Sequence, residues 1–330
     1  MIDPENVKKD FPVFEEYPEL VYLDNAATTQ KPWQVTDRIE EFYRKENANV
    51  GRGLYGLANK ATKAYNNARE SVAEFIGSSR DEIVFVRNTT EAYNLLAHSL
   101  ELDGKIVVPE MAHHSEQLPW RRKAEEEDLE LEYVPTEDYG LDIDAARNII
   151  DENTALVSIS MVSNVFGTRN PVEEIIELAH ENNALVVVDA AQAAPRQKID
   201  VKQLDADFLA FSGHKMLAPD IGVLYGRKEL FEDMKPYQVG GGMINKVIRD
   251  ELRWAEVPEK FEAGTPDVAG AVALAEAIEY LEDIGLEEIR EHEYRIASKI
   301  REGLGEVEGV EVLAPEGEKV SVISFTTDFA

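Results

Sequence analysis

Side chains suited to chemistry occur in five short clusters of the sequence. They are Asn88-Thr89-Thr90, His113-His114, Asn164, Asp189 with Gln192, and Ser212 with His214 and Lys215. Together they offer an amine, a carboxylate, flat imidazole rings and hydroxyl groups. Such a set could form a covalent bond with an aldehyde, balance a protonated ring nitrogen and bind a phosphate.

Each cluster also has an ordinary structural interpretation. Thr89 or Thr90 could cap a helix, and Asp189 could form a turn after three valines. Lys215 could be a solvated loop lysine, and the histidines and Asn164 could be plain loop residues. What favours chemistry is that every cluster directly follows a predicted strand, because ligands of open parallel sheets bind beyond the carboxyl ends of strands. The joint placement predicts a site for pyridoxal phosphate.

Strands and helices alternate along most of the chain, which predicts an α/β fold with a mostly parallel sheet. Strands are expected at 83–86, 105–108, 129–134, 155–161, 184–188, 208–211 and 222–225. Helices are expected at 34–45, 60–76, 91–98, 116–126, 144–150 and 172–181. After residue 267 the pattern changes to two long helices, 268–284 and 286–304, and two strands, 310–313 and 320–325.

Length and hydropathy set the class of protein. A chain of 330 residues, 44% of them hydrophobic, can form one large domain and a smaller one. The sequence contains no apolar run of the roughly 20 residues needed to span a bilayer, and its first residues lack the pattern of a secretory signal. We therefore expect a soluble, cytoplasmic protein without a membrane partner.

The charge is strongly acidic, with a formal net value of -31. Nucleic acid is an unsuitable partner for such a chain, because phosphate backbones require a basic surface. The charge is compatible with an ordinary, strongly solvated surface. It is equally compatible with a halophilic protein, since concentrated salt screens repulsion between like charges.

The sequence contains no cysteine. Disulfide bonds, zinc-thiolate sites and cysteine nucleophiles are therefore excluded within these 330 residues, and we assign no metal site.

The clusters belong to longer motifs that resemble a known family. YLDNAATTQKP, FVRNTTEAYN, MAHHSEQLPW, MVSNVFGTRNP, VVVDAAQAAP, DFLAFSGHKM, GGGMI and FEAGTP occur in family order. Over nearly its whole length the chain resembles class V aminotransferase-fold enzymes, and within them the SufS-type (group II) cysteine desulfurases. The resemblance implies the fold type I of pyridoxal-phosphate-dependent transferases. It also implies a cofactor-binding large domain, 20–283, and a small domain, 1–19 and 284–330.

The resemblance implies a role for each matching residue. Lys215 is the Schiff-base lysine, Asp189 pairs with the pyridine nitrogen, and Gln192 and Asn164 contact the ring oxygen and the substrate. His113 stacks on the ring and relays protons. The phosphate is bound by the following residues: Thr89, Thr90, Ser212, His214 and, from the second subunit of a homodimer, Thr265.

Some positions depart from the family pattern. Histidines usually flank the Arg-Gly pair near the N-terminus, whereas Gly51 and Tyr55 stand here; Arg52 still matches and is a candidate substrate residue. Asn88 replaces a glycine before the paired threonines. The cofactor residues are unaffected, so these departures bear on substrate handling.

The resemblance ends at Phe325 or shortly after, where relatives continue with a catalytic cysteine and a carboxylate-binding arginine. We therefore expect the small domain to be incomplete at its C-terminal edge and the chain to be inactive or slow alone. The first hypothesis is a cysteine desulfurase that mobilises sulfur from L-cysteine for iron-sulfur cluster assembly. A second chain would supply the missing groups, and a sulfur-acceptor protein would take the product.

Two alternatives remain. One is a self-sufficient pyridoxal phosphate enzyme acting on a related amino acid, such as a selenocysteine or cysteine lyase or an aminotransferase. Elimination of a good leaving group needs the lysine and the ring but no enzyme thiol. The other is a non-catalytic scaffold for sulfur-transfer partners, which would have no need of Lys215 and Asp189.

Overall fold

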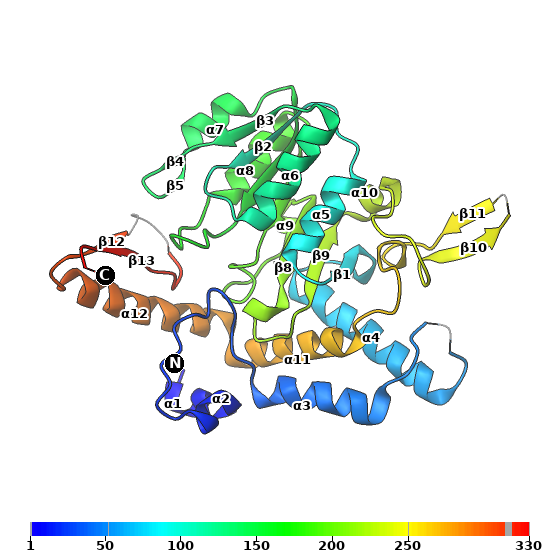
Figure 1. Ribbon diagram of the computed structural model, residues 1–330, viewed down its shortest axis with the longest axis horizontal. Coiled ribbons are helices and arrows are strands. Elements are labelled where there is room, and N and C mark those ends of the chain that lie inside the picture. The colour runs from blue at the N-terminus through cyan, green and yellow to red at the C-terminus, as the bar shows by residue number, and fades with distance from the viewer. Residues whose placement is uncertain (1, 52, 250, 314–318, 330) are drawn as a thin grey trace. The chain divides into compact units, whose positions relative to one another are not determined.

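The computed structural model describes residues 2–51, 53–249, 251–313 and 319–329 (Figure 1). The chain forms two compact units. Unit 1 consists of residues 1–2, 102–197 and 284–330, and unit 2 of residues 3–101 and 198–283. These units do not test the predicted division into a large and a small domain, which stays a prediction.

Unit 1 is built on four parallel strands. In spatial order they are β7 (Leu185–Asp189), β6 (Thr154–Ser160), β2 (Lys105–Pro109) and β3 (Leu131–Val134). Three helices connect them: α6 (His114–Glu127), α7 (Ile143–Ile149) and α8 (Val172–Glu181). Parallel neighbours need such crossovers, and strands covered on both faces read as continuous apolar runs. The runs IVV in β2 and VVV in β7 are buried accordingly.

The C-terminal part of unit 1 contains one long helix and a pair of strands. These are α12 (Leu286–Gly305), β12 (Val310–Leu313) and β13 (Ser324–Thr327), and the two strands are antiparallel. A small hairpin, β4 (Thr136–Glu137) and β5 (Gly140–Leu141), follows β3. The helices predicted at 268–284 and 286–304 and the strand predicted at 310–313 are confirmed. The second strand, predicted at 320–325, begins four residues later, at Ser324.

Unit 2 contains three antiparallel strands, β1 (Ile83–Val86), β9 (Gly222–Gly226) and β8 (Phe208–Ser212), with β9 in the middle. The predicted α/β class and the parallel strands of unit 1 are confirmed. The sequence analysis did not foresee that β8 and β9 are antiparallel. Residues 213–221 connect them through a single 3-10 turn, which is too short for the dozen or more residues of a parallel crossover.

Residues from three helices of unit 2 line a common groove: α3 (Trp33–Glu41), α4 (Gly56–Phe75) and α11 (Val268–Ile284). The π-helical turn η2 (Phe42–Glu46) extends α3. The unit also contains α1 (Pro4–Val7), α2 (Pro12–Glu16), α5 (Thr89–Ser99), α9 (Val201–Leu204) and α10 (Lys228–Asp233). In the part of the chain that the structure describes, no helix is both long and apolar enough to cross a membrane.

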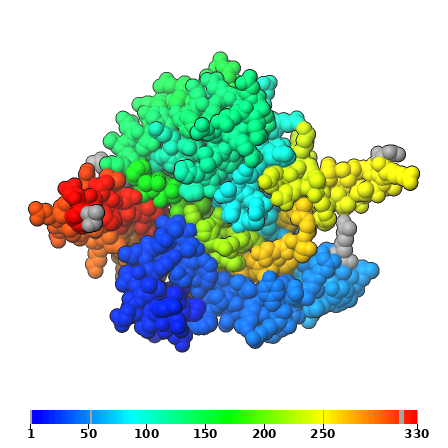
Figure 2. Space-filling model, viewed as in Figure 1, coloured from blue at the N-terminus to red at the C-terminus, as the bar shows by residue number. Residues whose placement is uncertain are grey.

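A hairpin of unit 2 was not predicted from the sequence. It consists of β10 (Ile244–Ile248) and β11 (Glu251–Trp254), which pair with each other as a separate two-stranded sheet. Figure 2 shows it in yellow as a projection. Val247, Ile248 and Leu252 are exposed on it. Neither strand has a buried face, and the sequence of neither is a continuous apolar run.

A buried ion pair ties α4 to the loop before α11. The Arg69 guanidinium donates two hydrogen bonds to the Glu262 carboxylate, each 2.7 Å long. That carboxylate also accepts from the Tyr65 hydroxyl at 2.9 Å and from the Phe85 amide at 2.7 Å. Arg69 donates further to the Ile83 carbonyl at 2.7 Å. A fully hydrogen-bonded pair of this kind fixes the loop against β1.

Replacement of Glu262 by glutamine should destabilise the protein, because it leaves the Arg69 charge buried without its carboxylate. Breaking a buried ion pair in this way costs about 3 to 5 kcal/mol. Urea unfolding of Glu262→Gln and of the exposed control Glu259→Gln measures the difference. Equal midpoints for both variants and the parent would contradict the assigned role of the pair.

Candidate functional site

In unit 2, two of the predicted clusters lie next to each other. Val86, the last residue of β1, and Ser212, the last residue of β8, both pair with Gly222 at the start of β9. The carboxyl ends of β1 and β8 therefore meet. The cluster of Asn88 and Thr89 and the cluster that begins at Ser212 follow these ends directly.

The first contact between the clusters joins Thr89 and Ser212. The Thr89 amide donates to the Ser212 hydroxyl at 2.9 Å, and the two hydroxyl oxygens lie 2.8 Å apart. A Cβ at Gly222 would lie 2.5 Å from the Asn88 Cα, so only glycine permits this approach. Thr89 also begins α5, whose N-terminus has the positive dipole end that suits a phosphate.

Lys215 ends the 3-10 turn η4 (Gly213–Lys215) that follows β8. Thr29 holds the backbone on both sides of it. The Thr29 amide and hydroxyl donate to the His214 carbonyl at 2.9 and 3.0 Å, and the hydroxyl accepts from the Leu217 amide at 2.9 Å. Leu217 has a φ of 66°, a left-handed conformation that costs energy in a branched residue and recurs at functional sites.

Two further basic residues lie in or beside this turn, His214 within it and Lys31 next to it. The Lys31 ammonium donates to the His214 carbonyl at 3.4 Å, and burial lowers the pKa of Lys31, against the opposing charge of Asp220. Burial also lowers the pKa of His214, and the positive charge of Lys215 acts in the same direction. The His214 ring is therefore neutral at neutral pH and can exchange hydrogen bonds with a phosphate.

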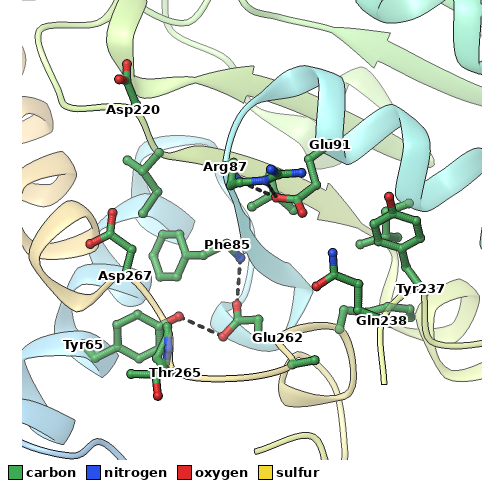
Figure 3. Close-up of a pocket in the computed structure, with 16 residues that line it drawn as sticks. Tyr65, Phe85, Arg87, Glu91, Asp220, Tyr237, Gln238, Glu262, Thr265 and Asp267 are labelled. Atoms are coloured by element: carbon green, nitrogen blue, oxygen red, sulfur yellow. Dashed lines mark hydrogen bonds and ion pairs between the residues drawn. The ribbon is translucent and has the colours of Figure 1, made fainter. Parts of the chain in front are cut away.

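Thr265 is exposed and lies in unit 2 beside two cavities. One, of about 430 Å³, is shown in Figure 3 with Thr265 near Tyr65 and Glu262. The other, of about 680 Å³, is also lined by Val50 and Gly51. The predicted substrate residue Arg52 lies outside the described residues, so its role stays a prediction.

In unit 1, three clusters follow neighbouring parallel strands. His113 comes after β2, Asn164 after β6, and Asp189 is the last residue of β7. The register pairs Ser160 of β6 with Asp189, so β6 and β7 end level with each other. The predicted arrangement at one edge of a parallel sheet is thus present within this unit.

Asp189 and Gln192 are both buried, with 7% and 3% of their surface exposed. One Asp189 carboxylate oxygen accepts from the Ala191 amide at 2.8 Å, which fixes the side chain in the turn after β7. The Gln192 side-chain oxygen accepts from the Arg196 guanidinium at 3.0 Å, and Arg196 pairs with Glu293 at 3.0 Å. These bonds set the orientation of the Gln192 amide group.

His113 and Asn164 are less enclosed. His113 is exposed at the N-cap of α6, where its Nδ1 accepts from the Ser115 amide at 3.1 Å. Asn164 is half-buried in the loop after β6, which is closed by the Ser163 hydroxyl accepting from the Val165 and Phe166 amides. Both residues are placed by backbone contacts of their own segments.

The donor set fits pyridoxal phosphate. Unit 2 provides an amine, two hydrogen-bonded hydroxyls and the N-terminus of a helix, which suit an aldehyde and a phosphate. Unit 1 provides a buried carboxylate for a protonated ring nitrogen and a ring for stacking. The assigned role of each residue stays a prediction.

Two residues in these surroundings were not singled out by the sequence analysis. Thr29 lies in the quoted motif YLDNAATTQKP, but its contacts with residues almost 190 positions away depend on the tertiary fold. Glu116 is completely buried behind Asp189. In a sequence, a glutamate in the first turn of a helix is read as a capping residue, so the buried position of Glu116 was not predicted.

Comparisons with known proteins agree with this site. Residues 21–329 match the model of the family described as aminotransferase class-V. A probable cysteine desulfurase of Halobacterium salinarum is 44% identical, with 99% of this chain and 82% of the relative covered. One from Streptomyces coelicolor is 45% identical over the same shares.

Solved structures are similar as well. The apo structure of a cysteine desulfurase from Thermococcus onnurineus has a TM-score of 0.95 at 41% identity, covering 100% of this chain and 84% of that one. An Escherichia coli cysteine desulfurase has a TM-score of 0.91 at 32% identity, with the same coverage. The predicted fold of pyridoxal-phosphate-dependent enzymes is therefore confirmed. The chain belongs to the class-V aminotransferases, an enzyme family whose cofactor is pyridoxal phosphate.

Proposed function

We propose that the protein is a cysteine desulfurase of the SufS type, which takes sulfur from L-cysteine for iron-sulfur cluster assembly. The observation that carries this proposal is the likeness to cysteine desulfurases at 41 to 45% identity over 98 to 99% of the chain. The two groups of polar side chains, one in each unit, support it, because they supply the donors that the cofactor requires.

In this proposal Lys215 would hold the cofactor by condensation of its amine with the aldehyde, which releases water, and the amine would carry a proton once the substrate displaces it. Thr89, Thr90 and Ser212 bind the phosphate together with the neutral ring of His214. When bound, pyridoxal phosphate supplies the electron sink for charge that develops at the substrate Cα.

The residues of unit 1 orient the ring and the substrate. Asp189 keeps a negative charge beside the ring nitrogen, and Gln192 and Asn164 donate hydrogen bonds near the ring oxygen and the substrate. His113 stacks on the ring and moves a proton, a task that suits imidazole because its pKa lies near neutrality.

We further propose a homodimer in which Thr265 reaches the phosphate site of the other subunit. The exposed position of Thr265 beside two open cavities supports this role. The buried Arg69–Glu262 pair holds the backbone three residues before Thr265. A rigid loop is what a contact across subunits needs.

The thiol that accepts sulfur must come from outside these 330 residues, because they contain no cysteine. We propose that a second chain supplies it, together with an arginine that binds the substrate carboxylate. One alternative is a lyase that eliminates sulfide or selenide, a reaction that needs no enzyme persulfide.

Lys215 should carry the cofactor covalently. Borohydride reduction of the protein with added pyridoxal phosphate should label the peptide that contains Lys215, as mass spectrometry would show. Lys31→Gln is a matched control, because that amine lies close to the same turn and its loss should leave the label in place. A label on any other lysine would refute the assignment.

Asp189→Asn should keep the cofactor bound and lose most turnover. The amide has the same shape but no charge, so it no longer favours protonation of the ring nitrogen. A loss of about 3 kcal/mol of transition-state stabilisation lowers the rate by about 10²-fold. With an added polypeptide that supplies the missing arginine and cysteine, alanine formation by Asp189→Asn is compared with that by Asp138→Asn, an exposed control in the same unit. Equal rates would show that Asp189 has another role.

The chain alone should release alanine from L-cysteine slowly or not at all, since no persulfide can form on it. Addition of a polypeptide that carries the missing arginine and cysteine should start turnover, and mutation of that cysteine should stop it. Fast, repeated turnover by the single chain without any added thiol would support the lyase instead.

A further inference from the structure

Glu116 is a glutamate buried completely inside unit 1, in the first turn of α6. Two hydroxyl groups of β6 bind its carboxyl group. Ser158 donates to Oε1 at 2.7 Å, and Ser160 donates to Oε2. Buried carboxyl groups need such partners, and these two attach the start of α6 to the middle strand β6.

The same strand places Glu116 beside Asp189. Ser160 is the β6 residue that pairs with Asp189 in the sheet register, and the Met161 amide donates to the Asp189 carbonyl at 2.8 Å. Two buried carboxyl groups thus lie close to the carboxyl ends of β6 and β7. Two such groups resist simultaneous ionisation.

Glu116 also lies one helical turn from His113. The Glu116 amide donates to the His113 carbonyl at 2.8 Å, and His113 begins the helix as its N-cap. The position of Glu116 therefore sets where α6 starts relative to β6 and Asp189. Two residues proposed to face the cofactor ring depend on this one side chain.

The charges around Glu116 favour its neutral form. Burial, followed by the negative charge of Asp189, raises the pKa of Glu116, and the Ser160 and Ser158 hydrogen bonds oppose the rise; the net pKa is about 8. Basic groups of the surrounding elements pair elsewhere: Lys105 of β2 with Glu132 and Asp151, Lys123 of α6 with Glu127, and Arg196 with Glu293. At the start of α6, His113 and His114 are exposed, and His113 accepts a hydrogen bond from the Ser115 amide.

We propose that Glu116 is a positioning residue of the cofactor site, which anchors α6 to β6 and, while neutral, leaves Asp189 as the charged carboxylate beside the ring nitrogen. This inference rests on the proposed cofactor role of Asp189. Loss of the Glu116 proton puts a second negative charge behind Asp189, so the electrostatic environment of the ring changes with pH.

The first readout is stability against pH. The pKa of Glu116 is higher in the folded protein than its ordinary value of 4.5, so its contribution to stability is complete below pH 4.5. That contribution falls as the pH rises to about 8 and is constant above. Between these values the unfolding constant of the parent, relative to that of Glu116→Gln, should increase about tenfold per pH unit. Glu126→Gln is the matched control, with the same change on the exposed side of the same helix.

The second readout is the absorbance of bound pyridoxal phosphate against pH, which a purely structural residue would not affect. The parent and Glu126→Gln should show an inflection near pH 8 that Glu116→Gln lacks. Ser158→Ala serves as a second variant should Glu116→Gln fail to fold. It removes a hydrogen bond that lowers the pKa of Glu116, so its inflection should move to higher pH.

The two readouts decide the proposal without an assay of turnover. Loss of the stability slope in Glu116→Gln with an unchanged absorbance curve would leave Glu116 a structural residue and overturn the positioning role. An unchanged slope would overturn the burial argument itself. Failure of desulfurase activity leaves both readouts intact. Failure of the parent to bind cofactor appears separately as missing borohydride label at Lys215, and it overturns the positioning role together with the proposed site.

Discussion

Burial of charge is the constraint on which the candidate site depends. A carboxylate withdrawn from water loses hydration worth several kcal/mol, and it stays charged only where hydrogen bonds or opposite charges replace that hydration. Asp189 is such a group, held by the Ala191 amide at the end of a central buried strand. In the proposed site the positive ring nitrogen of the cofactor is its counter-charge.

Several charged or titratable groups near Asp189 have partners of their own. Arg196, the nearest buried cation in sequence, is engaged by Glu293 and by Gln192. Glu116 adds no charge while it retains its proton. The Arg69–Glu262 pair in unit 2 shows the opposite solution, because there each buried charge is satisfied within the chain and the result is a fixed loop. The proposed role of Asp189 directs a buried charge toward a ligand, whereas the Arg69–Glu262 pair uses buried charges for stability.

Features of the site that depend on local sequence could be predicted, whereas features that depend on contacts between distant segments could not. Asp189 and Lys215 were predicted because apolar runs mark strands, and a polar residue at the end of a strand is a local signal. β8 and β9 are antiparallel because the nine residues between them are too few for a parallel crossover. The sequence analysis did not use the length of this connection. The β10–β11 hairpin was missed because neither strand has a buried face, so its sequence lacks the continuous apolar run that marks a buried strand. Thr29 and Glu116 act through contacts with distant segments, which no local pattern reports.

The site also shows why sulfur chemistry can be separated from cofactor chemistry. In the proposed function, carbanion stabilisation at the substrate draws on a lysine, a carboxylate and residues that would bind the cofactor phosphate, and these 330 residues contain a candidate for each. Sulfur transfer would need a thiolate that reaches the substrate sulfur, which is a separate task from binding the cofactor. A thiol can therefore come from a different segment or chain without any change to Asp189, Lys215 or Thr89. The demand on that thiol is geometric, because a few tenths of an ångström to one ångström of misplacement is enough to slow an attack that the cofactor has already made favourable.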